Sequence, residues 1–304
     1  MVDYETGMAD EVKIEDAGDS SDYTQYLGRI TAASHTVSPD VTQGYTIGDW
    51  KPKENIDGLT TIEGSVTCSP PNLKLLQLVG TYSEDTDEGI YSISLDKILG
   101  KTTFKQQKIG DGGVATLSGF KFGSYTMRVG EDQDLEIELS GQGDDFDLDT
   151  STTITTPSAN SYDTKKYYDV KVSIDGDTVG SAASVTADYN RDLEAIKGME
   201  DNSSRTPTEI IEKNFDHSFD IDINITNADA YSKMLDDASS PYTIQDERSD
   251  QDIVVTIDTS AGNDTYTMKN CRMEEISSDM DDSKDKRIAT IRGVCRDVEI
   301  SGDT

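Results

Sequence analysis

Apolar and polar side chains alternate over much of this chain, the pattern of β-strands with one buried face. It is clearest at residues 218–225, SFDIDINI. Residues 226–227, Thr-Asn, follow with side-chain oxygens that can cap a helix. A helix is therefore predicted from Ala228 to Asp237, with Met234 and Leu235 on its apolar face.

The same strand-to-helix unit occurs earlier, at residues 60–78. Its helix is predicted from Pro71 to Val79, because a helix tolerates proline in its first turn. A shift of 159 residues brings Ile62 onto Ile221 and the apolar positions of the two helices onto each other.

A strand, a glycine turn and a return strand then follow in both halves, at a shift of 151 residues. Each half closes with one more alternating strand. These segments are 101–109, 110–113, 114–122 and 135–139 in the first half, and 253–258, 261–264, 265–273 and 289–291 in the second. We interpret the repeated order as a tandem duplication.

The remaining pattern completes a mainly β fold. Strands are expected at 26–37, 91–95, 167–174 and 185–193, and polar loops at 81–89 and 201–215. Asp175-Gly176 is the residue pair of a tight hairpin turn. Two tandem antiparallel β-sandwich domains are predicted, each with one short flanking α-helix. The expected divisions are an N-terminal arm 1–22, domain 23–150, linker 151–165 and domain 166–304.

The charge is extreme: 60 acidic against 27 basic residues give −33, with a pI near 4.1. Such a composition is found in disordered chains, but strand periodicity over most of the length argues against disorder. Molar salt shortens the Debye length to about 3 Å, so dense surface carboxylates then repel each other little. The sequence therefore predicts a folded protein of a halophilic host.

Composition also narrows the classes of partner. Attraction to nucleic acid or an anionic membrane needs a basic patch, and the chain has no apolar run of 18 residues. The acidic N-terminus lacks a signal-peptide pattern, so synthesis and folding in the cytoplasm are expected. For the three cysteines, buried thiols are favoured, while a disulfide between Cys271 and Cys295 stays open.

No catalytic, cofactor or metal site is predicted. The alternating carboxylates at 144–149 and 279–282 lack the glycine and glutamate of a calcium loop and fit a solvated surface better. His35 and His217 lie in different halves, and no nucleophile elbow, zinc spacing or phosphate loop is present. Trp50 suits a core or a subunit interface. An enzyme using paired carboxylates is the weakest hypothesis.

The strand-to-helix units SVTCSPPNLKLLQLVG and INITNADAYSKMLDD precede a hairpin whose return strand ends in a polar kink, at 122–125 and 273–277. This order resembles the tail tube proteins of long-tailed bacterial and archaeal viruses. It resembles more distantly the tube proteins of contractile tails and type VI secretion. The resemblance implies a non-catalytic virion protein that polymerises into stacked rings. With a duplicated domain, it implies trimeric, pseudo-hexameric rings of an archaeal virus.

The resemblance also implies the partners: other copies of the chain, tail proteins at the tube ends, and double-stranded DNA in transit without specific binding. Edge-to-edge joining of sheets would remove their open edges, and an acidic polar lining is expected for the channel. The alternative is an extracellular β-sandwich module of a halophile that binds carbohydrate or acts as an adhesin. That class predicts an exposed aromatic platform, which one Trp and scattered Tyr do not provide.

Overall fold

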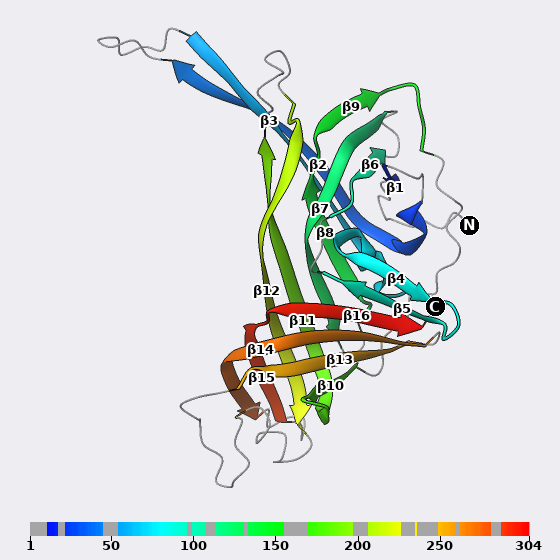
Figure 1. Ribbon diagram of the computed structural model, residues 1–304, viewed down its shortest axis with the longest axis vertical. Helices are drawn as coiled ribbons and strands as arrows, with labels where there is room; N and C mark the ends of the chain where they lie inside the picture. The colour runs from blue at the N-terminus through cyan, green and yellow to red at the C-terminus, as the bar shows by residue number, and fades with distance from the viewer. Residues whose placement is uncertain are drawn as a thin grey trace, which may run out of the picture.

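The computed structural model describes residues 11–17, 22–44, 54–95, 99–107, 113–130, 133–154, 170–196, 206–225, 235, 249–259, 262–280 and 287–303. Over these residues the protein is mainly β, with all strand pairs antiparallel (Figure 1). The expected mainly β class is thus confirmed. Apart from Leu235, which is helical, the predicted helix at 228–237 lies outside the described part, as do Trp50 and most of the predicted turn at 110–113.

One large sheet of eight strands organises the molecule. Its order is β2 (Arg29–Gly44), β3 (Glu54–Ser69), β8 (Glu136–Gln142), β7 (Val114–Gly130), β11 (Asp177–Ile196), β12 (Glu209–Ile225), β15 (Arg287–Val294) and β14 (Gly262–Met280). Three of these long strands continue into further strand pairs, β7 with β6 (Thr102–Gln107), β14 with β13 (Gln251–Thr259) and β11 with β10 (Val170–Ile174) (Figure 1).

The further layer of the first half pairs β1 (Glu11–Asp16), β6 (Thr102–Gln107), the start of β7, and β9 (Asp145–Asp149). In the second half the corresponding layer consists of β10 (Val170–Ile174), β13 (Gln251–Thr259), the start of β14, and β16 (Asp297–Asp303). A hairpin of β4 (Thr81–Asp85) and β5 (Ile90–Ser94) adds to the edge of β16.

Apolar residues from both halves share one core, as the alternation predicts. Ile62, Ile137 and Ile221 are buried, whereas Glu63 and Glu138, the chain neighbours of the first two, face away from the core. The long-range pairing of first-half and second-half strands makes this core continuous across the chain.

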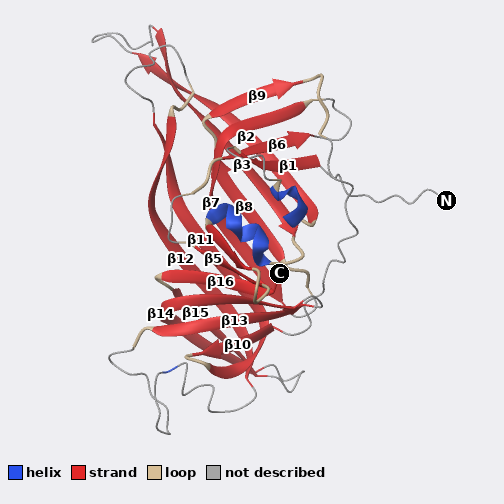
Figure 2. Cartoon of the chain, turned by 45° about the vertical axis from the view of Figure 1, so that its right-hand side comes forward, coloured by secondary structure: helices blue, strands red, loops and turns tan. Residues whose placement is uncertain are grey.

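Two short 3-10 helices lie against the sheets (Figure 2). Tyr23–Tyr26 forms η1, and Leu73–Val79 forms the 3-10 helix η2 where an α-helix was expected at Pro71–Val79. The Asn72 side chain caps η2 by accepting from the backbone N–H of Lys74. Asp264 of β14 accepts from the N–H of Leu73, so the second half also holds this helix in place.

Three segments differ from the expectation. Residues 11–16, assigned to the N-terminal arm, form β1 and bury Val12 and Ile14. The loop expected at 81–89 contains β4, whose partly and fully exposed side chains give no periodic signal. The loop expected at 201–215 contains the start of β12, where the strand gains its pairing from β11.

Matching bulges interrupt β7 and β14 where each strand leaves one layer for the other. The irregularities lie between Phe122 and Ser124, and between Met273 and Glu275. These are the polar kinks of the sequence. Gly141 and Gly293 sit opposite, where an added Cβ would lie 2.0 Å and 2.2 Å from a backbone carbonyl oxygen of the bulged strand. Only glycine permits that close approach.

Candidate assembly and channel surfaces

The two halves of the chain meet at an internal sheet join between β7 and β11. Seven residue pairs are in register, from Ser124 opposite Asn190 to Gly130 opposite Ser184. Tyr125 and Tyr189 stack at this join with ring centroids 5.3 Å apart. Offset stacking of buried aromatic rings adds about 0.5–1.5 kcal/mol beyond their area burial. The join is therefore a packed part of the core.

A buried ion cluster reinforces the internal join. Glu212 of β12 lies 2.8 Å from Lys121 Nζ and 3.4 Å from Arg191 Nη1, and all three side chains are at most 11% exposed. Glu212 also accepts from the N–H of Leu99, and Arg191 donates to the carbonyl oxygen of Leu95. Because these bonds connect both halves, the cluster opposes their separation.

The two ends of the eight-stranded sheet are open among the described residues. At one end β2 pairs only with β3, and at the other the second part of β14 pairs only with β15. Val37 of β2 is 37% exposed, and Ile276 of β14 is only partly buried. Open edges of this kind pair readily with a further strand.

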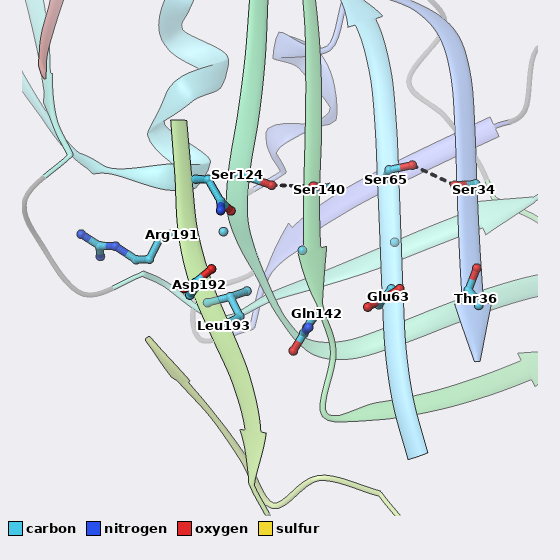
Figure 3. A pocket seen from close by; sticks show the side chains of 14 residues that line it. Ser34, Thr36, Glu63, Ser65, Ser124, Ser140, Gln142, Arg191, Asp192 and Leu193 are labelled. Atoms are coloured by element: carbon cyan, nitrogen blue, oxygen red, sulfur yellow. Dashed lines mark hydrogen bonds between the residues drawn. The ribbon is translucent and has the colours of Figure 1, made fainter. Parts of the chain in front are cut away.

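The sheet surface that faces away from the core, which we call the polar face, carries small hydroxyl and amide residues. One row crosses five paired strands and contains Ser34, Ser65, Ser140, Ser124 and Asn190. Hydroxyl pairs bridge neighbouring strands at 2.8 Å (Ser34–Ser65) and 2.6 Å (Ser124–Ser140), as Figure 3 shows. A shallow polar groove of about 420 Å³ follows this row.

Carboxylates outnumber cations on the polar face. The alternation places there Glu63, Glu136, Glu138, Asp188, Asp192, Glu194, Asp216, Asp220, Asp222, Glu274 and Glu275. Three of its cations are already ion paired within the sheet. Arg128 binds Glu136, Lys213 binds Glu194, and Arg292 binds both Asp220 and Glu275. The hydrogen bonds that Arg292 donates to Asp220 and then to Glu275 raise the pKa of Arg292.

A comparison with models of protein families shows which family this chain belongs to. The family model described as phage tail tube protein matches residues 18–295. The chain belongs to the phage tail tube protein family. No curated protein sequence matches it.

Family membership assigns this tail tube protein a structural role in the virion tail. It also accounts for a sheet with two open ends, since a tube subunit associates with further copies of itself. Within the described residues, no helix is long and apolar enough to span a membrane. The surface-module alternative receives no support from the match.

Asp144, Asp149 and His35, which were singled out in the tube protein's sequence, take ordinary structural roles. Asp144 pairs with Lys101 at 2.9 Å. Asp149 accepts from Ser151 and Thr152, and these hydrogen bonds lower its pKa to about 2. His35 bonds Gln106 at 2.9 Å. Asp281 and Asp282 lie outside the described residues, within which no cluster of three potential metal ligands is found.

The sequence did not predict two features of these surfaces. The pairing of β7 with β11 joins segments about 60 positions apart and leaves no local signal. The ion cluster combines Lys121, Arg191 and Glu212 from three strands, and charged residues are frequent throughout this chain. In the sequence, the visible signal of this cluster was Arg191, a positive side chain at a position where the alternation of β11 predicts burial.

Proposed function

We propose that the chain is a duplicated tail tube subunit whose internal join is repeated between chains to close a ring. The observation that carries this proposal is the β7–β11 pairing between halves, together with the two unpaired sheet ends. The same contact, applied between β14 of one chain and β2 of the next, removes both open edges.

The strand pairings support the duplication underlying this ring. Seven strands of the first half have counterparts in the same pairing order: β1 and β10, β2 and β11, β3 and β12, β6 and β13, β7 and β14, β8 and β15, β9 and β16. The bulges fall at matching places, such as Ile30/Ala32 in β2 and Ala182/Ser184 in β11.

These pairings align the two strand-to-helix units differently from the 159-residue shift that the sequence analysis used. Val66 pairs with Leu139, and Ile221 pairs with Ile291. In this correspondence Val66 matches Ile221 instead of Ile225, a displacement by an even number of positions. An even displacement keeps every side chain on the same face, so alternation alone could not detect it.

The duplication specifies the register between chains. Tyr125 and Tyr189, opposite each other at the internal join, correspond to Ile276 and Val37. Ile276 of one chain therefore lies opposite Val37 of the next. Both are apolar side chains that a single chain leaves partly exposed, and the ring buries them as Tyr125 and Tyr189 are buried.

Strand geometry favours three chains in the ring. With eight strands each, three chains form a barrel of roughly 24 strands. At a spacing of about 4.8 Å and a tilt of about 40°, its backbone diameter is roughly 48 Å. Side chains from the walls occupy roughly 10 Å, which leaves room for a DNA duplex of roughly 20 Å with its hydration. Two chains would leave a bore of roughly 22 Å, too narrow for a hydrated duplex.

The polar face lines the bore in this arrangement, and DNA passes along it without specific binding. A wall of exposed cations would bind each phosphate and gain affinity by counterion release. Carboxylates outnumber the cations on this face, and three of those cations are held by neighbouring acids. In the molar salt of a halophilic archaeal host, repulsion of the duplex is confined to contact range.

A cross-link experiment tests the ring. Val37→Cys and Ile276→Cys are introduced together, and assembled protein in molar salt is treated with a short bis-maleimide. We expect covalent dimers and trimers, with the trimer as the end point within one ring. The matched control moves the first cysteine to Glu84 on β4, away from the join, and should give no such series. Absence of cross-links, or an end point other than three, would contradict the proposal.

A further inference from the structure

A buried polar chain runs through the second half, at a place where the first half is apolar. Cys295 Sγ lies 2.7 Å from His217 Nδ1, and His217 Nε2 lies 2.5 Å from the hydroxyl of Tyr266. That hydroxyl lies 2.6 Å from the hydroxyl of Tyr125. Cys271 Sγ donates to the carbonyl oxygen of Met268 at 3.3 Å, and the residue is 1% exposed.

The duplication shows that the fold does not require this chain of polar groups. The strand pairings match Cys271, Cys295 and His217 with Phe120, Gly143 and Ile62 of the first half. The backbone is the same in both places: Gly143 N–H donates to Ile62, and Cys295 N–H donates to His217. Two thiols and an imidazole therefore replace an apolar contact on an unchanged backbone.

Cys271 lies on β14, and Cys295 directly follows the neighbouring strand β15. Arg272 of β14 is opposite Val294 of β15, so Cys271 and Cys295 are the next pair along the two strands. In the first half, a Cβ added to Gly143 would lie 3.4 Å from Phe120 Cδ2, which shows how closely these positions approach.

The surroundings also make the two thiols unequal. Interaction with the Cys271 thiol, followed by interaction with the His217 imidazole, lowers the pKa of Cys295 against the opposing effect of burial. Interaction with Cys295 and burial raise the pKa of Cys271. Cys295 is the thiol in contact with His217, at 2.7 Å, and it is also the more exposed of the pair, at 8%.

We propose that Cys271 and Cys295 form a thiol modification site, which a small peroxide converts to a disulfide within the subunit. The Cys295 thiolate attacks one peroxide oxygen, the O–O bond breaks, and hydroxide leaves as water with the proton held by His217. Cys271 sulfur then attacks the Cys295 sulfenic acid, the S–O bond breaks, and a second water leaves with the thiol proton of Cys271. Two thiols and one hydrogen peroxide become one disulfide and two waters.

A peroxide suits this site because it is nearly as small as water and Cys295 is barely exposed. Cys68, the third cysteine, is fully buried in the first half, and burial raises its pKa. Cys68 has no thiol neighbour in the described residues and serves as the internal reference. The bond would tie β14 to β15 just before the β14 bulge, beside the sheet end that is open in a single chain.

The test treats the full chain, free and assembled in molar salt, with hydrogen peroxide. We expect free thiols, counted in denaturant, to fall from three to one. We also expect a mass loss of two hydrogens, a mapped Cys271–Cys295 peptide pair, and a higher melting temperature that a reducing agent reverses. Three remaining thiols, a bond involving Cys68, or sulfinic acid without a disulfide would overturn the proposal.

Variants then assign the roles. Cys68→Ser should leave the reaction unchanged. Cys271→Ser should stop at a trappable sulfenic acid on Cys295, and Cys295→Ser should remove the reaction. His217→Asn should slow the loss of thiols at least several-fold while the disulfide still forms. An unchanged rate in a folded His217→Asn protein would show that His217 has no part in the step.

Discussion

Replacing Glu212 by Gln tests whether the buried ion cluster holds the two halves together. Gln keeps the shape of the side chain but leaves Lys121 and Arg191, 9% and 7% exposed, without their counter-ion. At an effective dielectric constant of about 20, attraction across 2.8 Å is roughly 6 kcal/mol and across 3.4 Å roughly 5 kcal/mol. Desolvation offsets much of this, and breaking such a pair typically costs about 3–5 kcal/mol.

The expected result for Glu212→Gln is a melting temperature lower by roughly 6–20 °C. Scanning calorimetry and denaturant titration in constant molar salt measure this loss. Glu194→Gln is the matched control, because Glu194 pairs with Lys213 at 2.7 Å but both side chains are half exposed. It should cost at most about 1 kcal/mol. A loss below about 1 kcal/mol for Glu212→Gln would refute the reasoning that the two cations depend on Glu212.

Three further results are expected. The subunit should melt at a lower temperature in dilute buffer than in molar salt because of its −33 charge, and salt-independent melting would contradict this. Asp264→Asn removes a buried carboxylate that accepts from the Tyr91 hydroxyl at 2.7 Å and from Leu73 N–H; it should cost about 1–3 kcal/mol by denaturant titration, and a loss near zero would count against it. Hydrogen bonds from Lys105 and Lys13 lower the pKa of Glu15 below 4.5, so their stabilisation is complete above the unfolded-state pKa and disappears as pH falls through the lowered value. The melting-temperature difference between wild type and Glu15→Gln should therefore shrink in acid, and a constant difference would refute this assignment.

The sequence predicted many of the strands whose two faces differ, although it missed β1 and β16. Phe219, Ile221 and Ile223 alternate with polar residues because one face of β12 is buried, and this is visible locally. The positive backbone φ angles of Asp175 and Gly176 follow from their preference for a tight turn. Strand β4 escaped prediction because its side chains have no consistently buried face.

The sequence predicted what kinds of surface the protein has, but it did not predict where they lie in the fold. An open sheet edge and an acidic polar face follow from alternation and composition. The join of β7 with β11, the row through Ser140 and the cluster at Glu212 depend on which strands become neighbours. That choice is made by the packing of the whole core, and a window of adjacent residues does not contain it.

The internal join has a consequence for the timing of assembly. It forms as the chain folds, so its strength does not depend on protein concentration, whereas a β2–β14 contact between chains does. Buried charges and stacked tyrosines can therefore strengthen the covalently linked join without making newly made subunits stick to one another. In the proposed ring, the outer edges with Val37 and Ile276 set the concentration at which rings appear. A cell could accumulate folded monomers and still polymerise them on demand.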